Sequence, residues 1–382
     1  MKMDAIEPGW RRRFRRNLRA WYSKHARELP WRMTHDAYRI WISEIMLQQT
    51  TVAAVIPYYE RFLSRFPTVE DLAAAQEEDV LRIWEGLGYY SRARNMHKTA
   101  QQVVESYGGH FPSDVDRLRQ LPGIGRYTAG AIASFAFDRA APIVEANTLR
   151  LYCRLLGYRD DPRSKAGQQR LWEFAQAVLP AQNPGRFNQA LIELGGVICT
   201  PNTPDCPKCP VRNCCQAYSQ SLQSVIPKPS KRTKPTHVTE VAIAVRQGSC
   251  FLLIRQPEGQ RWAGLWDFPR FQVTNKIDHH SPAPNGRIHS ALVASLERQL
   301  HDSFGVTVEI EQFLSEIHHT VTRFRITLKC FEAEFHSISD SSKTGEFRWT
   351  QTSELCELPL SVTGRKLANL LSQAKNQFWI SP

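Results

Sequence analysis

The sequence has no apolar run that approaches the length of a membrane span, which takes about 20 residues in a helix. Its first residues, MKMDAIEPGWRRRF, also lack the apolar stretch of a secretory signal peptide. With 382 residues and 42% hydrophobic content, the chain is long enough for two domains and can bury real cores. We therefore expect a cytoplasmic protein with no membrane partner.

Acidic residues are outnumbered, with 37 against 49 basic residues and a net charge of +12. Such a surplus suggests a polyanionic partner, because each neutralised phosphate releases counterions; a merely soluble basic surface is the alternative. No acid occurs between Asp205 and Glu240. Within that stretch, IPKPSKRTKPTH holds three prolines, four basic residues and no apolar pattern. This composition predicts a linker over 225–237, either following a phosphate backbone or serving as a solvated tether.

The residues before the linker have helical periodicity. Trp10, Phe14, Leu18, Trp21 and Tyr22 recur at helical spacing, with arginines on the other face. Glycines and prolines separate further helical stretches, which we expect at 36–66, 68–85, 91–107, 114–120 and 127–137. The pattern predicts an all-α domain over residues 1–224.

After the linker the pattern changes to short runs rich in valine, isoleucine and phenylalanine, which predict strands. These runs are VTEVAIAVR, CFLLIRQ, VTVEIEQF, RFRITLKCFEAEF and EFRWTQ. One helix is expected from about His289 to Phe304. The sequence thus predicts a second, smaller domain of the α/β or α+β class over residues 238–382.

Nine cysteines are present, and five of them lie between Cys199 and Cys215. Cys199, Cys206, Cys209 and Cys215 are separated by six, two and five residues. Four thiolates in one loop suit a 4Fe-4S cluster, in which each iron takes one cysteine. Zinc also accepts four thiolates, but zinc ribbons usually pair two CxxC knuckles and only one is present. The spacing therefore favours the cluster, with Cys214 left over.

A helix, a tight turn and a second helix are predicted around LPGIGRYTAG at 121–130. Gly123 and Gly125 permit the turn, and the next helix begins there with the positive end of its dipole. Backbone amides combined with that dipole bind a phosphate without reading sequence. We expect this hairpin, including Gly123 and Gly125, to contact DNA.

Several motifs together resemble those of the adenine DNA glycosylases, the MutY family of helix-hairpin-helix, iron–sulfur DNA glycosylases. They are the LPGIGRYTAG hairpin, WISEIMLQQT at 41–50, FNQALIELGGVICT at 187–200 and the four cysteines. The resemblance covers about residues 14–220, and the rest of the chain follows the same plan more loosely. It implies a helical glycosylase domain with an iron–sulfur loop at 199–215, then a Nudix-like domain that recognises oxidised guanine.

The resemblance supplies two carboxylates for releasing a base, a reaction that requires protonation of the purine and stabilisation of the sugar cation. Glu44 matches the acid that protonates a ring nitrogen of the flipped adenine, and its apolar neighbours should raise its pKa. The family places an aspartate followed by Gly-Asn after the hairpin, whereas this chain has Glu145, Ala146 and Asn147. We expect Glu145 to stabilise the oxocarbenium ion beside the retained Asn147; a slow or inactive enzyme that still binds its lesion is the alternative.

Tyr127 occupies the hairpin position at which related bifunctional glycosylases carry a lysine. That lysine forms a Schiff base with the sugar, which tyrosine cannot do, so backbone cleavage should be weak or absent. The family resemblance also places Gln49 and Tyr89 around oxidised guanine, where they would wedge into the duplex. Arg32 and Gln189 match residues near the adenine pocket.

The C-terminal half resembles a Nudix-like domain through GLWDFP at 264–269 and LERQLHDSFGV at 296–306. The hydrolase box needs several glutamates to hold magnesium, but only Glu297 and Asp302 are acidic here, so we expect no pyrophosphate hydrolysis. Adenine glycosylases often carry Phe-Ser-His in a strand loop that reads oxidised guanine. This chain has Val321, Thr322 and Arg323 there, and Thr322 can hydrogen-bond as serine does.

The function that these observations predict is that of a monofunctional adenine DNA glycosylase in base excision repair, a hydrolase. Its partner would be double-stranded DNA carrying an A:8-oxoguanine or A:G mismatch, and we expect a monomer associated with the nucleoid. One alternative is a glycosylase for another mismatch, such as thymine opposite guanine, or for oxidised pyrimidines. Another is a catalytically weak protein that binds the lesion.

Overall fold

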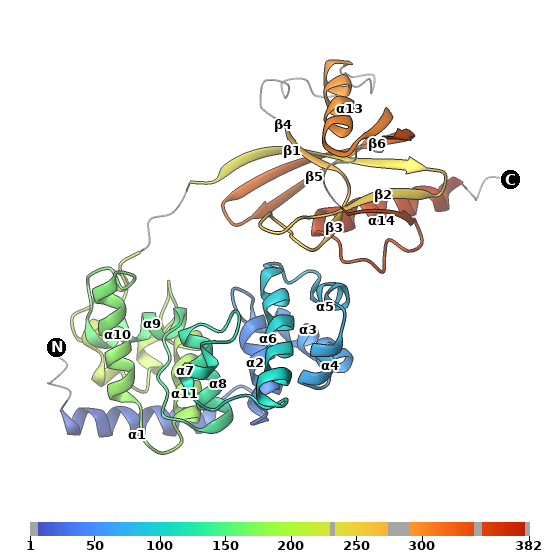
Figure 1. Ribbon diagram of the computed structural model, residues 1–382. Helices are drawn as coiled ribbons and strands as arrows, with labels where there is room; N and C mark the ends of the chain where they lie inside the picture. The colour runs from blue at the N-terminus through green and yellow to red at the C-terminus, as the bar shows by residue number, and fades with distance from the viewer. Residues whose placement is uncertain (1–6, 230–233, 274–289, 340–345, 379–382) are drawn as a thin grey trace. The chain divides into compact units, whose positions relative to one another are not determined.

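Helices occupy most of the chain up to the linker, as the periodicity predicts (Figure 1). They are α1 (Pro8–His25), α2 (Ala37–Met46), α3 (Val52–Arg65), α4 (Val69–Ala74), α5 (Glu77–Trp84), α6 (Ser91–Tyr107), α7 (Val115–Leu118), α8 (Arg126–Phe137), α9 (Ala146–Leu156), α10 (Lys165–Val178), α11 (Pro184–Val197) and α12 (Gln216–Ser219). Short 3-10 turns lie at η2 (Pro30–Arg32), η3 (Cys206–Lys208) and η4 (Arg212–Cys214). None of the described helices is long and apolar enough to span a membrane.

The structure is a computed structural model that describes residues 7–229, 234–273, 290–339 and 346–378. These residues form two units. The first comprises the described residues up to Ala74 and those from Asn95 to the gap at 230–233. The second comprises the segment 75–94 and the described residues after that gap. Part of the predicted linker, 230–233, lies outside the described residues.

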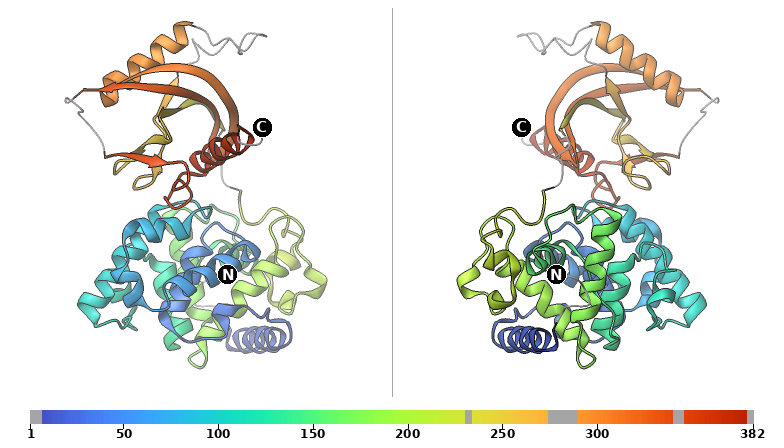
Figure 2. Two further views of the ribbon diagram at one scale, coloured as in Figure 1. Left: turned by 90° about the vertical axis from the view of Figure 1, so that its right-hand side faces the viewer. Right: turned by 90° about the vertical axis from the view of Figure 1, so that its left-hand side faces the viewer.

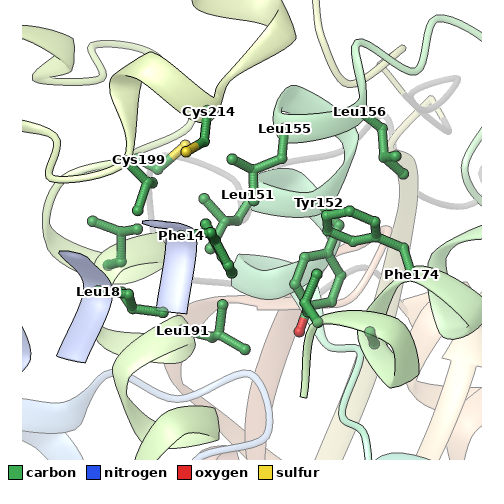
Figure 3. Packing of buried hydrophobic residues seen from close by; sticks show 14 of the residues in the cluster. Phe14, Leu18, Leu151, Tyr152, Leu155, Leu156, Phe174, Leu191, Cys199 and Cys214 are labelled. Carbon is green, nitrogen blue, oxygen red and sulfur yellow. The ribbon is translucent and has the colours of Figure 1, made fainter. Parts of the chain in front are cut away.

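The core of the first unit confirms the periodicity of the N-terminal segment. Phe14, Leu18, Trp21 and Tyr22 are buried along one face of α1. They pack in one cluster with apolar side chains of α9, α10 and α11, including Leu151, Leu155, Phe174 and Leu191 (Figure 3). Burial of these large side chains supplies the main hydrophobic stabilisation of this unit, at roughly 1.5–3 kcal/mol for each fully buried side chain.

Two predicted stretches are each two helices rather than one: 36–66 contains α2 and α3, and 68–85 contains α4 and α5. Asp36 caps α2 by accepting hydrogen bonds from the backbone amides of Tyr38 and Arg39. The helix ends at Met46, and the chain turns before α3 begins at Val52. Within this turn Gln49 adopts a left-handed backbone with φ of 63°. A glutamine in that conformation is uncommon and marks a locally constrained backbone.

The second unit contains a seven-stranded mixed sheet of order β3-β2-β1-β6-β5, with β4 paired to β1 and β7 to β2. Its strands are β1 (Thr236–Gln247), β2 (Cys250–Arg255), β3 (Trp266–Asp267), β4 (Arg270–Val273), β5 (Val306–Val321), β6 (Phe324–Ile338) and β7 (Phe347–Gln351). β1 and β6 pair in parallel, and the other pairs are antiparallel. The five longer predicted strands are confirmed, whereas the short strands β3 and β4 were not predicted.

A helix covers each face of this sheet (Figures 1 and 2). Along β1, alternate side chains enter opposite cores, because successive residues of a strand face opposite ways. Val241, Ile243 and Val245 pack in the core that contains residues of α13 (Ser290–Phe304). Ala242 and Ala244 pack in the core that contains residues of α14 (Val362–Phe378). The helix predicted up to Phe304 is thus present, whereas α14 was not predicted.

Candidate active site

A cleft of about 1250 Å³ in the first unit is lined by residues from α2, the turn after it, the hairpin, α9 and α11. Nine of the residues singled out from the sequence line it, although they are spread over more than 150 positions of the chain. They are Arg32, Glu44, Gln49, Gly123, Gly125, Tyr127, Glu145, Asn147 and Gln189. A concave site with convergent polar groups is the usual form of an active site.

Glu44 is a buried carboxyl group on α2 and accepts a hydrogen bond of 2.7 Å from the Tyr127 phenol on α8. Burial raises its pKa to about 7, because the charged form loses hydration. The Tyr127 hydrogen bond and the charge of Arg32 lower the pKa, whereas the charge of Glu145 raises it. The carboxyl group can therefore hold a proton near neutral pH.

Glu145 is the N-cap of α9, and both its carboxylate oxygens are hydrogen-bonded. Oε2 accepts from the amide of Asn147 and Oε1 from the amide of Thr148, each at 2.8 Å. The Thr148 hydroxyl accepts from the Glu145 amide at 2.8 Å, which completes a capping box. Burial raises the pKa of Glu145, and the two backbone hydrogen bonds oppose that rise. A carboxylate fixed in this way cannot swing away from the cleft without uncapping the helix.

Asn147 connects this carboxylate to a buried arginine of the same helix. Its Nδ2 donates to Glu145 Oε2 at 3.2 Å, and its Oδ1 accepts from Arg150 at 2.9 Å. Arg150 also donates to the carbonyls of Gly195 and Cys199, each at 2.7 Å. The α9 end that faces the cleft is thereby tied to the end of α11 and to the start of the cysteine loop.

The cleft wall formed by α11 contains an ion triad of Glu193, Arg27 and Arg32, in which Arg27 is partly exposed. Glu193 is fully buried and accepts hydrogen bonds from Arg27 at 2.6 and 2.9 Å and from Arg32 at 2.7 Å. Burial alone would raise the pKa of Glu193, but the two arginines together hold it below its ordinary value. The triad fixes Arg32 in the cleft wall, where Tyr22 also donates to Gln189 at 3.2 Å.

The hairpin turn is shaped by Gly123, whose φ is 74°. A Cβ there would lie 2.9 Å from the Cβ of Asn95, so both the backbone and the packing require glycine. Thr99 pins the turn by donating to the Pro122 carbonyl at 2.7 Å. Gly125 is the N-cap of α8 and offers no side chain there, which leaves the first amides of that helix open to a ligand.

The four cysteines Cys199, Cys206, Cys209 and Cys215 line one cavity at the other end of α9. Burial, with a smaller contribution from the neighbouring thiols, raises the pKa of Cys209 to about 12. Arg154 donates to Cys199 Sγ at 3.3 Å, and its carbonyl accepts from Cys215 Sγ at 3.4 Å. In the described part of the chain no three His, Cys, Asp or Glu side chains are placed to hold a single metal ion. Four thiols on one cavity suit a cube in which each iron takes its own cysteine.

Cys214 does not line this cavity. Its side chain is buried in the same apolar core as Phe14 and Leu18, next to Cys199 (Figure 3), and its carbonyl accepts from the Trp10 indole at 3.2 Å. It behaves as a small apolar core residue, a common role for a free buried cysteine.

Two of the residues singled out from the sequence belong to the second unit rather than to the cleft. Tyr89 is 46% exposed with φ of 49°, and the Arg92 guanidinium lies 5.5 Å from its ring centroid. Its neighbour Tyr90 is buried. Thr322 is exposed with φ of 51° in the turn between β5 and β6. Both residues have a left-handed backbone conformation and present polar side chains at turns.

On the helix that corresponds to the Nudix box, the one glutamate has a structural partner. Glu297 accepts a hydrogen bond of 3.1 Å from the Ile310 amide at the start of β5. Asp302 is exposed and lies 3.5 Å from His301. Neither carboxylate is grouped with other acids, in keeping with the sparse acidic content of LERQLHDSFGV.

Sequence reasoning did not single out Glu193 or Arg27, although both shape the cleft wall. Glu193 lies in FNQALIELGG, four residues after Gln189 and therefore on the same face of α11. A glutamate placed on the buried face of a helix is a signal for a partnered charge, because an unpaired carboxylate would be costly there. Arg27 has no comparable signal, since exposed arginines are frequent on α1 and after it.

Comparisons with known proteins agree with this site. Residues 42–177 match the model of the HhH-GPD superfamily base excision DNA repair protein, and residues 240–370 match a NUDIX domain. The mouse adenine DNA glycosylase is 34% identical, over 93% of this chain and 77% of that protein. The human adenine DNA glycosylase is 42% identical, over 67% of this chain and 48% of that protein. A solved thermostable thymine-DNA glycosylase is 30% identical with a TM-score of 0.52, over 56% of this chain and 98% of that one.

The hairpin lies beside a cleft with one buried carboxyl group, Glu44, and one half-buried carboxyl group, Glu145. Together with the HhH-GPD match, this site defines a DNA N-glycosylase of base excision repair, a hydrolase. The second half of the chain is a Nudix-like domain. Because the similarity to the mouse protein extends over most of both chains, this chain belongs to the adenine DNA glycosylase family.

The Tyr127 hydrogen bond can be tested through the ionisation of Glu44. Since that hydrogen bond lowers the pKa of Glu44, Tyr127→Phe should raise it above about 7. Tyr152→Phe is the control, because that buried hydroxyl donates to the Ile143 carbonyl and not to Glu44. The measurement is a pH titration of ¹³C-labelled glutamate carboxyls by NMR, with Glu44→Gln assigning the signal. An unchanged or lowered pKa in Tyr127→Phe would contradict the assignment.

Proposed function

We propose that the protein hydrolyses the N-glycosidic bond of adenine mispaired with 8-oxoguanine or guanine, and that it does not cut the DNA backbone. The observation that carries the proposal is the buried Glu44 carboxyl, with a pKa raised to about 7, in the same cleft as Glu145. Family membership supports adenine as the base. The flipped adenosine would occupy the cleft between α2 and α11.

Glu44 is the proton donor in this proposal. Its carboxyl group gives its proton to a ring nitrogen of adenine, which makes the purine a better leaving group. The bond between the base and the sugar then breaks, and its electron pair leaves with adenine. Tyr127, which donates to Glu44 at 2.7 Å, keeps the carboxyl oriented toward the base during the transfer.

Glu145 is the proposed stabiliser of the sugar cation that remains. Its carboxylate is held by the α9 amides, so its charge is in place before the bond breaks and needs no rearrangement. Water then adds to the sugar carbon; its hydroxyl stays on the sugar and its second proton returns to a carboxylate. Aspartate, the residue of the family pattern, is shorter by one methylene, yet glutamate still reaches the cap and the cleft here.

The absence of backbone cleavage follows from the lining of the cleft. Schiff-base chemistry needs an amine that can attack the sugar. No lysine is among the described residues that line the cleft. Tyr127 stands at the lysine position of bifunctional relatives, and its phenol is already engaged with Glu44.

The opposite base is the proposed target of Gln49, Tyr89 and Thr322. Gln49 lines the cleft in a left-handed turn, from which it would enter the duplex at the position that the flipped base vacates. Thr322, at the exposed β5–β6 turn, stays the predicted contact to oxidised guanine in the second domain. Arg32 and Gln189, on the wall built by Glu193, would contact adenine.

One observation favours a second candidate function. The solved relative named a thymine-DNA glycosylase is 30% identical to this chain and covers 56% of it. A thymine opposite guanine is therefore a competing substrate. The mouse and rat adenine DNA glycosylases, however, match across the Nudix-like half as well, since each match covers 93% of this chain.

A single-turnover assay on duplexes with A:8-oxoguanine, A:G, T:G and A:T pairs separates these functions. We expect base release from the two adenine mismatches only, without strand scission and without a borohydride-trapped adduct. Glu44→Gln should slow release by roughly 10²–10⁴-fold, the usual contribution of a general acid, and should retain DNA binding. Glu60→Gln on α3, which does not line the cleft, is the matched control and should release adenine normally.

Release of thymine but not adenine would replace the adenine assignment with the thymine one. Tight binding to A:8-oxoguanine without any base release would show a lesion-binding protein. Glu145 and Ala146, which depart from the family pattern, would then be the first residues to test as the cause of the lost activity. Full activity of Glu44→Gln would remove the acid role from Glu44.

We also propose that Cys199, Cys206, Cys209 and Cys215 hold a 4Fe-4S cluster. The shared cavity, the all-thiol donor set and the family support it. Such a cluster, when bound, would supply a covalent staple for the loop between α11 and α12 and no step of base release. The loop without Cys214 provides one thiolate for each iron.

Iron and sulfide analysis of anaerobically purified protein tests the cluster. We expect about four iron and four sulfide per chain. Cys206→Ser should lower both contents and weaken the visible absorption of the protein. Cys214→Ser should leave both unchanged, because Cys214 lies in the core and not in the cavity. Stoichiometric zinc with no sulfide would overturn the proposal.

A further inference from the structure

Arg126 follows the hairpin directly and is the first residue of α8. Its guanidinium lies over the indole of Trp172 on α10, with 3.8 Å between the guanidinium carbon and the ring centroid. The guanidinium therefore lies over the ring in a cation–π contact, and tryptophan is the aromatic side chain that holds a cation best.

No carboxylate neutralises this guanidinium. In the described part of the chain the Arg126 side chain has neither a hydrogen bond nor an ion pair with an acid. The hairpin's other arginine, Arg119, lies 3.6 Å from Asp116. The nearest acid on α10, Glu173, accepts instead from Gln169 at 3.0 Å. The N–H groups on the edge of the Arg126 guanidinium are therefore open to an external acceptor.

The indole is a rigid platform for this cation. Trp172 is only 7% exposed and packs in the same core as Phe174 and Leu171. A ring held in a packed core does not move to follow the arginine, so the arginine loses rotamer freedom before it meets a ligand. The entropy cost of ordering the Arg126 side chain is therefore not added when the ligand binds, which strengthens the contact.

The position of Arg126 indicates which ligand it meets. It lines the cleft together with Gly123 and Gly125, and it also lines a separate groove of about 690 Å³ with Lys165 and Trp172. It thus stands next to the open amides at the start of α8, which are themselves suited to binding a phosphate. A planar guanidinium with free edges matches the oxygens of a phosphate in a two-point contact.

We propose that Trp172 is a positioning residue for DNA binding: it holds the Arg126 guanidinium beside the hairpin so that Arg126 binds a phosphate of the DNA backbone. The contact adds a side-chain phosphate site to the backbone amides of the turn. It rests on the protein being a DNA glycosylase and is independent of the base that is removed. Being a phosphate contact, it is insensitive to sequence.

The first test measures the affinity of the full-length protein for a fully paired duplex as a function of salt. Arg126→Ala should weaken binding about tenfold and reduce the slope of log K against log salt by about 0.9, the loss of one phosphate contact. The control is Arg61→Ala on α3, which removes an arginine lying 4.5 Å from the Tyr58 ring and lining neither the cleft nor the groove. Arg61→Ala should reduce the slope of log K against log salt by less than Arg126→Ala does. An unchanged slope in Arg126→Ala would overturn the proposal.

The second test is a double-mutant cycle that separates positioning from a structural role. Trp172→Leu should weaken DNA binding in the parent protein, and Trp172→Phe, which keeps a ring, should restore part of the loss. In an Arg126→Ala background, Trp172→Leu should weaken binding no further. Equal losses in both backgrounds would show that Trp172 acts only through folding, and would overturn its positioning role. If Trp172→Leu does not fold, the same comparison with Trp172→Phe decides the point.

Discussion

The hydrogen bond between the Tyr127 phenol and the buried Glu44 carboxyl is the interaction on which the active site depends. It joins α2 to α8, so the position of the Glu44 carboxyl relative to the helix that follows the hairpin is fixed. Burial alone would push the pKa of Glu44 upward, and the phenol and Arg32 restrain that rise, leaving it at about 7. A proton donor for work near neutral pH needs that balance between burial and stabilisation of its charged form.

The second carboxyl group is held by a different device. Glu145 caps α9 with both oxygens, and Arg150 of that helix donates to the carbonyl of Cys199. One helix therefore carries the proposed cation stabiliser at its start and contacts the cysteine loop along its length. On the opposite wall, Arg27 and Arg32 donate hydrogen bonds to the buried Glu193 carboxylate. These contacts fix the wall, because a paired buried charge is costly to disturb. The cleft is thus preorganised by buried polar contacts rather than by apolar packing alone.

Much of this arrangement could be predicted from the sequence, because local patterns carry it. The α1 periodicity, the hairpin glycines and the cysteine spacing each depend on a few neighbouring residues. The turn at 47–51 could not be predicted, since LQQTT has no glycine or proline and the left-handed Gln49 is imposed by tertiary packing. The Arg126–Trp172 stack was missed because it joins segments that are distant in sequence. Helix α14 was missed although Leu367, Ala368 and Leu371 recur at helical spacing within it. The role of Glu193 could be predicted only by knowing that its face of α11 is buried.

The central claim, that Glu44 is the acid and Glu145 its ionised partner, is tested most directly by the rate of adenine release at different pH. Under single-turnover conditions the rate should fall about tenfold per pH unit above roughly 7, because Glu44 loses its proton there. On the acid side it should fall where Glu145 becomes protonated, above the ordinary pKa of a glutamate, since burial raises its pKa. A rate that stays constant from pH 6 to 9, or that rises as Glu44 ionises, would contradict the account.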